Sequence, residues 1–130
     1  MLWVALELPA LSLQLAERAG VSREPLVISE GPTQRPIVAC ANAAAKDAGG
    51  REGHAVAAAK ALVAGDLRVF ARDLDAEREA LERLAAWAGQ FTPMVNIESQ
   101  GIAMDVGASL RLFGGHAKLT RAIRKGVREL

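Results

Sequence analysis

Three carboxylates of this chain are candidate ligands for a divalent cation. Glu7 lies on an apolar run near the start of the chain, while Glu98 and Asp105 flank a turn much further along. Carboxylate oxygens are the ligands that Mg²⁺ prefers, so pairing of these residues across one sheet would create a metal site. The alternative, which we favour, is that Glu7 is a solvated or hydrogen-bonded carboxylate and that Asp105 serves the structure of its strand end.

The cysteine and the two histidines indicate no further metal or nucleophile site. Cys40 is the only cysteine of the chain, which excludes an intrachain disulfide and a cysteine-rich zinc site. Its neighbours Ala39 and Ala41 predict a buried core thiol, because no adjacent base supports a reactive one. His54 and His116 lie far apart without ligands at metal-binding spacing, so we expect them on the surface or at helix starts.

The last helical stretch of the chain carries a cluster of cationic side chains. Few acidic residues accompany them, and a charged helix face is usually only solvated. Contact with phosphate groups is the alternative, and it would not involve base stacking because no aromatic residue is interleaved with the cations. Arg35 and Lys46 are two further candidates for holding a phosphate. The cluster consists of Lys118, Arg121, Arg124, Lys125 and Arg128.

The bulk composition fits one modest domain or a piece of a larger protein. The chain has 130 residues, of which 51% are hydrophobic, enough for a packed core and too many for a disordered chain. The formal net charge of +1 does not by itself indicate a nucleic-acid partner. The start lacks the basic residues of a signal peptide, and no apolar run approaches the roughly 18 residues of a membrane helix. We therefore expect a cytoplasmic protein with no membrane partner.

Hydrophobic periodicity predicts a chain in which strands and helices are mixed. The segments 25–29 and 37–40 are expected to pair as antiparallel strands around a turn rich in glycine and proline. The segments 94–98 and 102–106 are expected to form a hairpin. Strands are predicted at 3–8, 25–29, 37–40, 67–71, 94–98 and 102–106, and helices at 11–19, 43–48, 53–64, 76–90 and 116–130.

Capping residues and apolar faces support three of the predicted helices. Asn42 is expected to cap the short helix that follows it. Either Asp73 or Asp75 is expected to cap the longer helix that begins near residue 76. The buried faces are predicted to consist of Leu81, Leu84, Ala88 and Phe91 in the longer helix and of Leu119, Ile123, Val127 and Leu130 in the last one.

The order of these elements predicts an α+β fold whose first strand is separated from its partners by an insertion. The region 11–73 is rich in small residues, while 1–10 and 74–130 alternate strand and helix. The helical pattern continues to Leu130 without a capping residue. We therefore expect the last region to be truncated at this residue.

This layout resembles the beginning of the Y-family, or translesion, DNA polymerases, which include the UmuC- and DinB-like proteins. In that family a first strand opens the palm, a small fingers subdomain is inserted, and the palm then resumes. The segment Cys40–Lys46 is similar to the fingers segment, and Ile102–Val106 is similar to the strand after the family's acidic pair. Phe91–Pro93 and the segment Gly107–Gly115, which reads GASLRLFGG, resemble the ImuB branch, whose members are polymerase-like but inactive.

The resemblance implies a palm built on a ferredoxin-like sheet with helices on one face. The palm-like first strand would occupy residues 1–10, the fingers-like insertion residues 11–73, and the palm-like remainder residues 74–130.

The departures from the family pattern decide the expected chemistry. Such polymerases hold Mg²⁺ with carboxylates between the attacking hydroxyl and the triphosphate. The family's first metal aspartate corresponds to Ala5, and its aspartate–glutamate pair to Gln100 and Gly101, so no carboxylate remains at these positions. The aromatic residue that screens the sugar corresponds to Ala10. The tyrosine and arginine that grip the phosphates correspond to Ala43 and Lys46.

The resemblance therefore implies a non-catalytic scaffold or adaptor in damage-induced (SOS) translesion synthesis and mutagenesis, without cofactors, in the bacterial cytoplasm near the nucleoid. It implies weak, non-specific binding to DNA. For the full-length protein it also implies a sliding clamp, a RecA-like accessory protein and an error-prone DNA polymerase as partners. Two alternatives stay open: a rearranged but active nucleotidyltransferase using Glu7, Glu98 and Asp105, and a regulatory protein-interaction domain without a DNA role.

Overall fold

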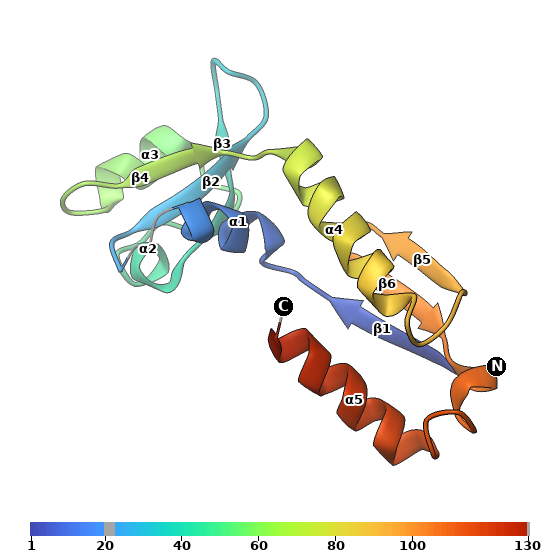
Figure 1. Cartoon of the computed structure of the whole chain (residues 1–130). Helices are drawn as coiled ribbons and strands as arrows, with labels where there is room; N and C mark the ends of the chain where they lie inside the picture. Colours follow the sequence, from blue (N-terminus) through green and yellow to red (C-terminus); the bar gives the residue numbers. More distant parts are fainter. Residues whose placement is uncertain (20–22, 130) are drawn as a thin grey trace. The chain divides into compact units, whose positions relative to one another are not determined.

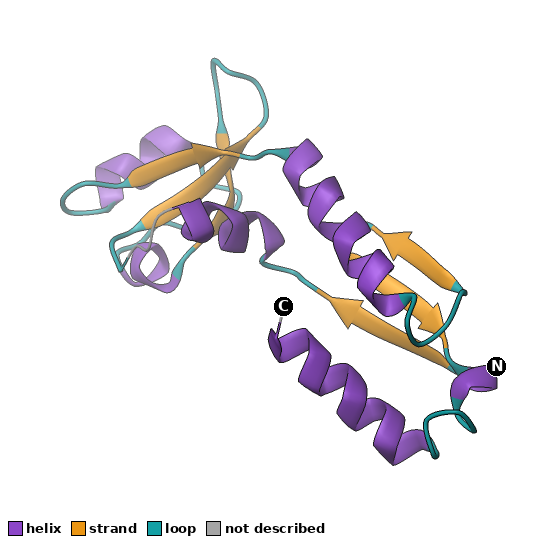
Figure 2. Cartoon of the chain, in the orientation of Figure 1, coloured by secondary structure: helices purple, strands orange, loops and turns teal. Residues whose placement is uncertain are grey.

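The computed structural model describes residues 1–19 and 23–129, in which strands and helices alternate along the chain (Figures 1 and 2). Each predicted strand and helix is present, with ends that differ by a few residues at most. None of the described helices is both long and apolar enough to cross a bilayer. The strands are β1 (Trp3–Glu7), β2 (Leu26–Glu30), β3 (Ile37–Ala41), β4 (Arg68–Ala71), β5 (Val95–Glu98) and β6 (Gly101–Asp105). The helices are α1 (Leu11–Ala19), α2 (Ala43–Asp47), α3 (Val56–Leu62), α4 (Leu74–Ala88) and α5 (His116–Glu129), with a 3₁₀ turn η1 (Gly107–Ser109).

The chain divides into two compact units, each with its own sheet and core. The first unit combines Met1–Leu8 with Ala80–Leu130, and the second unit comprises Pro9–Glu79. The first strand of the chain therefore belongs with the C-terminal half, as its separation from its partners predicted.

The sheet of the first unit has three antiparallel strands in the order β1–β6–β5. Val4 lies opposite Met104 and Leu6 opposite Ile102 in the β1–β6 pair. Val95 lies opposite Met104 in the β5–β6 pair, which confirms the predicted hairpin. Because successive side chains point to opposite faces of a strand, these apolar residues share one face of the sheet.

Helices α4 and α5 cover this apolar face (Figure 1). Leu84 of α4 and Leu119 of α5 join Ile102 and Met104 in one buried cluster. The predicted position of both helices on one face of the sheet is thereby confirmed. The predicted core residues that are buried are Leu81, Leu84, Ala88, Phe91, Leu119 and Ile123.

A close approach between α5 and α4 explains why Val127 departs from its predicted burial. A Cβ atom at Gly126 would lie 2.4 Å from Cζ2 of Trp87, so α5 presents bare backbone to the indole ring. Val127 is turned by about 100° from that contact, the rotation per helical residue, and it is 37% exposed. The predicted burial of Val127 is therefore wrong, and Leu130 lies outside the described residues.

The segment between β6 and α5 is fastened to the core by a serine. Ser109 is 6% exposed, and its hydroxyl donates a hydrogen bond to the carbonyl oxygen of Phe91. Gly114 and Gly115 follow with φ angles of 78° and 104°, a backbone conformation that suits glycine. The chain can thus reverse directly before α5 begins at His116.

The sheet of the second unit has the order β3–β2–β4, with β2 antiparallel to β3, as predicted, and parallel to β4. Val27 of β2 packs in a core with Ala45 of α2 and Val56 of α3. Leu26 and Ile28 flank Val27 along the strand, so they point to the opposite face, and they are also buried. Helix α1 contacts β2 and β3, which accounts for a central strand that is apolar on both sides.

Helix α3 is shorter than predicted because the residues before it pair with β3. The amide of Gly53 donates to the carbonyl oxygen of Val38 at 2.9 Å, and the amide of Val38 donates to the carbonyl oxygen of His54 at 2.8 Å. Ala55 forms an isolated bridge with Ile37. Residues 53–55 therefore extend the β3 edge, and the helix starts only at Val56.

Helix α4 begins two residues before its predicted start. Asp73 is the capping residue, since its Oδ1 accepts a hydrogen bond from the amide of Ala76 at 3.0 Å. Asp75 lies within the first turn of the helix, where a negative charge favours the amino end of the helix dipole.

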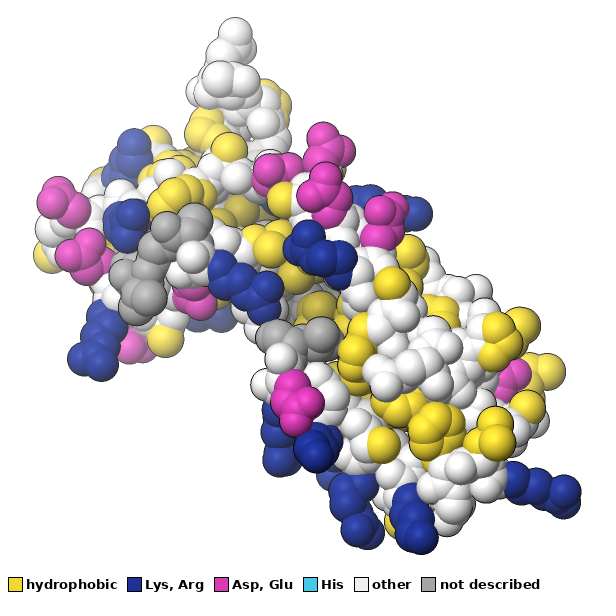
Figure 3. Space-filling model, in the orientation of Figure 1, with side chains coloured by type: hydrophobic (Ala, Val, Ile, Leu, Met, Phe, Trp, Pro, Cys, Tyr) yellow, Lys and Arg dark blue, Asp and Glu magenta, His cyan; other side chains and the backbone are white. Residues whose placement is uncertain are grey.

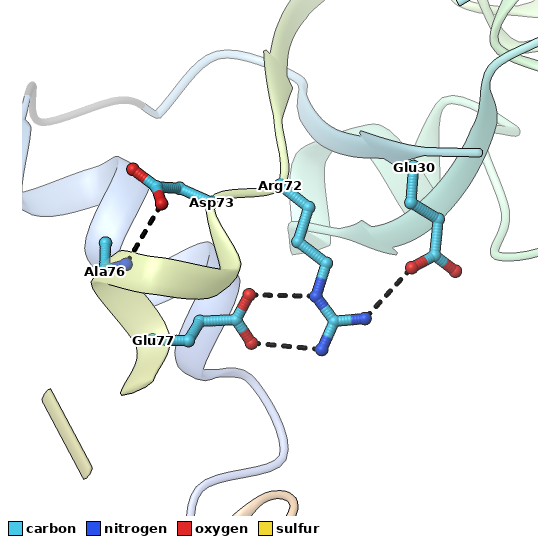
Figure 4. A network of polar contacts seen from close by, with 5 residues as sticks. All are labelled: Glu30, Arg72, Asp73, Ala76 and Glu77. Atoms are coloured by element: carbon cyan, nitrogen blue, oxygen red, sulfur yellow. Dashed lines mark hydrogen bonds and ion pairs between the residues drawn. The ribbon is translucent and has the colours of Figure 1, made fainter. Parts of the chain in front are cut away.

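An ion-pair network inside the second unit anchors the first turn of α4 (Figure 4). Arg72 donates from Nε and Nη2 to the two carboxylate oxygens of Glu77 at 2.8 and 3.0 Å. Its Nη1 donates to Oε2 of Glu30 at 2.9 Å. These hydrogen bonds, with Glu77 foremost, raise the pKa of Arg72 above its ordinary value. The network ties the ends of β2 and β4 to the start of α4.

Candidate functional site

The uncovered face of the first sheet carries two of the predicted carboxylates. Glu7 on β1 lies opposite Gly101 on the central strand β6, and Glu98 on β5 lies opposite the same glycine. Both carboxylates are exposed. Two strand spacings separate their Cα atoms by about 10 Å, so Glu7 and Glu98 flank Gly101 from either side.

Asp105 lies at the other end of β6. It is four residues from Gly101, a distance of about 14 Å along a strand. Its Oδ1 accepts hydrogen bonds from the amides of Leu2 at 3.3 Å and Gly107 at 3.1 Å. This carboxylate therefore fastens the start of the chain to the η1 turn, in agreement with its predicted structural role. Among the described residues, no three His, Cys, Asp or Glu side chains come together as ligands for one metal ion.

Between these carboxylates the uncovered face consists of small and neutral side chains. Ala5 is exposed on β1 and lies opposite Ala103 on β6. Ala103 in turn lies opposite Asn96 on β5. The middle of the face thus offers two methyl groups and one amide.

The backbone at Gly101 leaves no room for a side chain. A Cβ atom at this position would lie 2.0 Å from the carbonyl oxygen of Leu6 and 3.0 Å from the Cα atom of Glu7. Next to it, the amide of Leu8 donates to the carbonyl oxygen of Gln100 at 2.6 Å. Strand β1 therefore closes against the turn at 100–101 through backbone contacts, while the Gln100 side chain remains exposed.

Asn42 is the central polar residue of the second unit. It caps α2, as predicted, because its Oδ1 accepts a hydrogen bond from the amide of Ala45 at 2.9 Å. The same oxygen accepts from the amide of Leu26 at 3.0 Å, and Nδ2 donates to the carbonyl oxygen of Glu24 at 2.8 Å. Asn42 is only 8% exposed. It therefore joins the start of β2 to the start of α2, and Ala43 beside it is exposed.

The structure does not bring Arg35 and Lys46 together. Arg35 precedes β3 and Lys46 follows it, and five strand residues span about 14 Å from first to last Cα. Lys46 lies in a shallow hollow with Arg51, Asp47 and Glu52, and its Nζ is 4.0 Å from Oε1 of Glu52. Two cations and two anions line this hollow, so its charge is balanced. Ala10, the other predicted substrate position of this unit, accepts the first hydrogen bond of α1 from Gln14 at 2.9 Å.

The cysteine and histidines take no part in a cluster of ligands. Cys40 is half-buried instead of buried as predicted. The register shift in the β2–β3 pair places it opposite Ile28, away from the core that holds Val38 and Ala41. Burial is the main cause that raises the pKa of the Cys40 thiol. His116 is exposed at the first residue of α5, as expected, and His54 is half-buried two residues before α3.

The five predicted cations of the last helix all lie exposed on α5. In Figure 3, dark-blue side chains gather along the lower edge of the molecule, where Figure 1 places this helix. No described residue forms an ion pair with any of them.

Sequence reasoning missed two polar networks of the second unit. Arg72 and Glu30 are 42 residues apart, and Asn42 and Leu26 are 16 apart. Capping and periodicity rules concern neighbours in the chain, so they contain no signal for such pairs. The only sequence signal at Arg72 was its place between a predicted strand and a capping aspartate.

Comparison with solved structures assigns the fold. The chain matches a Y-family DNA polymerase chimera of Dbh and Dpo4 with a TM-score of 0.79 and 18% identity, over 99% of this chain and 39% of that one. It matches the DinB protein from Sulfolobus solfataricus with a TM-score of 0.79, 19% identity and the same coverage. An insertion ternary complex of Dbh DNA polymerase gives 0.78 and 17% identity, again over 99% and 39% of the two chains. The fold is the α+β palm fold of the Y-family polymerases, and the chain spans about two fifths of the matched structures.

Comparison with protein-family models identifies the family of the chain. The model described as the impB/mucB/samB family matches residues 10–130, and this chain belongs to that family. No curated protein sequence matches it significantly. The family match starts after β1 and does not include Ala5. The position of Ala5 beside the site is therefore given by its pairing with Ala103 of β6.

Proposed function

We propose that this chain is the palm- and fingers-like part of a non-catalytic, ImuB-like member of the family. Its role would be that of a scaffold or adaptor in damage-induced translesion synthesis and mutagenesis. The GASLRLFGG sequence between β6 and α5 supports the ImuB-like assignment. In the full-length protein the partners would be DNA, a sliding clamp, a RecA-like accessory protein and an error-prone polymerase, in the bacterial cytoplasm near the nucleoid.

The closed backbone at Gly101 is the observation that carries this proposal. A polymerase site of this family would need a glutamate there, yet even a Cβ atom would overlap the carbonyl oxygen of Leu6 at 2.0 Å. Backbone atoms of a paired strand cannot move aside as a flexible side chain can. With Ala5 and Gln100 at the other two positions, the residues present do not fit Mg²⁺, which requires several oxygen ligands in octahedral geometry.

The geometry disfavours a rearranged nucleotidyltransferase. Ligand oxygens of one Mg²⁺ lie about 2 Å from the ion. Asp105 lies about 14 Å along β6 from the row that holds Glu7 and Glu98, and its oxygen is engaged by two backbone amides. These three carboxylates therefore have no common point that one cation could occupy.

Primer extension by the full-length protein tests the lack of catalysis. We expect no nucleotide incorporation with Mg²⁺ or Mn²⁺, for the wild type and for the Glu7→Gln variant alike. Incorporation by the wild type that disappears in Glu7→Gln would contradict the proposal, because it would reveal a working site around that carboxylate.

Substitution of Gly101 tests the steric argument separately. We expect Gly101→Glu to lose at least about 3 kcal/mol of unfolding free energy, since overpacking costs ~1–3 kcal/mol even where side chains can yield. Ala5→Glu is the matched control, because it adds the same carboxylate to the exposed neighbouring strand, and it should cost less than about 1 kcal/mol. A Gly101→Glu variant that is as stable as the control and gains stoichiometric Mn²⁺ binding would overturn the argument.

A further inference from the structure

The charges of α5 are confined to one side of the helix. Lys118, Arg121 and Lys125 follow each other at spacings of three and four residues, and Arg124 and Arg128 lie on the adjoining rows. At 100° per residue the five positions fall within an arc of about 120°. We call these five residues the α5 cationic stripe.

The opposite side of α5 is committed to the core. Leu119 is 2% exposed and Ile123 is 4% exposed, and both belong to the core cluster under the sheet. The stripe is therefore fixed in orientation by apolar packing. It faces outward along its whole length of about 15 Å, which is ten steps of 1.5 Å from Lys118 to Arg128.

The stripe differs from an ordinary solvated helix face because all of its charges are positive. Helix α4 of the same chain carries four acidic and two basic residues in mixed order. Helix α5 carries five Lys or Arg residues and one acidic residue, Glu129, at its last described position. No described residue pairs with the five cations, so no ion pair among the described residues offsets their charges.

Helix stability does not account for this pattern. Like charges three or four residues apart destabilise a helix, and the stripe contains several such pairs, among them Arg121 with Lys125 and Arg124 with Arg128. The helix dipole favours cations only in the last turn. Arg128 lies there, whereas Lys118 is the third residue of α5, at the unfavourable end.

We propose that the α5 cationic stripe is a binding surface for the phosphate backbone of a nucleic-acid duplex, separate from the uncovered face of the sheet. A duplex strand presents one charge per about 3.4 Å of helix axis, so a rigid row about 15 Å long faces roughly four phosphates. Helix α5 contains no aromatic residue, so it offers no platform for stacking unpaired bases. Binding at this surface is electrostatic and indifferent to sequence, and it does not depend on the catalytic status of the sheet.

Fluorescence anisotropy with a labelled duplex at several salt concentrations tests the surface. With four to five phosphate contacts, log K should fall with log salt at a slope of about −4. The double variant Arg121→Ala/Lys125→Ala should bind at least about tenfold more weakly at low salt, with a slope nearer −2. Arg121→Lys/Lys125→Arg keeps the charges and should retain the wild-type slope.

The control is Arg51→Ala/Lys60→Ala, which removes the same two charges from exposed positions of the second unit. It should bind as the wild type does. Equal weakening by both alanine pairs would overturn the proposal, because net charge alone would then explain binding. Displacement of the duplex by polyglutamate at a lower charge concentration than unlabelled duplex requires would also overturn it, since it would assign the stripe to an acidic protein surface. Circular dichroism of each variant verifies that α5 is intact.

Discussion

Asn42 in the second unit and Asp105 in the first unit both join separate segments of the chain through hydrogen bonds to backbone groups. Asn42 makes three hydrogen bonds of 2.8–3.0 Å to backbone groups, and Asp105 accepts two of 3.1 and 3.3 Å. Ala43 lies next to Asn42, whereas Ala5 and Gly101 lie on the sheet whose central strand ends at Asp105. Polar residues that bond the backbone are therefore present in both units, whereas the positions that the family layout gives to metal or substrate contacts carry alanine, glycine, glutamine or lysine.

The two anchors differ in depth, and this difference should appear as a difference in stability. Asn42 is 8% exposed and satisfies the amide of a fully buried strand residue, Leu26. Asp105 is only partly buried, so water can replace part of the hydrogen bonding that its carboxylate gives to the two amides. The unfolding free energy lost on substitution should therefore be larger at Asn42 than at Asp105.

Asn42→Ala should have the largest effect, a loss of about 3 kcal/mol of unfolding free energy. Removal of a helix cap costs ~0.5–2 kcal/mol, and an unpaired buried amide at Leu26 adds ~1–3 kcal/mol. Urea denaturation measures the loss. Asn42→Asp is the control, because it keeps the accepting oxygen and should lose less. A loss below about 0.5 kcal/mol in Asn42→Ala would show that the amide network is incidental.

Arg72→Ala should lose about 2 kcal/mol, because it leaves Glu77, a nearly buried carboxylate, without its bidentate partner. Arg72→Lys should recover only part of the loss, since an ammonium group cannot match both oxygens at once. Thermal and urea denaturation of the two variants would measure this order. If Arg72→Lys were as stable as the wild type, the forked geometry in Figure 4 would not matter.

Asp105→Ala should lose about 1 kcal/mol, the net contribution of hydrogen bonds to a partly exposed carboxylate. Glu98→Ala removes an exposed carboxylate from the same sheet and should stay within about 0.5 kcal/mol of the wild type. The same denaturation assay compares them. An Asp105→Ala variant that loses as much as Asn42→Ala would abolish the proposed difference between the two anchors.

Lys46→Ala should have the smallest effect, within about 0.5 kcal/mol. Its contact with Glu52 is 4.0 Å long, and both side chains are more than half exposed, so solvent screens the pair. A loss above about 1 kcal/mol would mean that Lys46 stabilises the fold. The exposed alanines at the other expected contact positions, Ala43 and Ala5, have no side-chain group that could do so.

Sequence reasoning located the elements well because local periodicity and capping depend on neighbours in the chain. The hairpin at β5 and β6, the Asn42 cap, the apolar face of α4 and the burial of Leu119 and Ile123 in α5 were all predictable in this way. It extended α3 too far, because it could not foresee that residues 53–55 pair with β3. It missed the Arg72 network for the same reason, since its partners lie in different elements.

The candidate site was less predictable than the fold. The resemblance indicated which positions lack carboxylates, but no sequence pattern revealed that β1 closes on Gly101 or that Asp105 is engaged by two amides. Both facts depend on the register between strands that are nearly a hundred residues apart. Only the folded structure contains that information.

Mn²⁺ titration followed by electron paramagnetic resonance tests whether the residues of the first sheet can bind a divalent cation. Free Mn²⁺ loses its signal on binding, so the free-ion amplitude reports occupancy. We expect the wild type and Glu7→Gln to leave the same free Mn²⁺ at every concentration. Saturable binding of one ion by the wild type that is lost in Glu7→Gln would contradict the account.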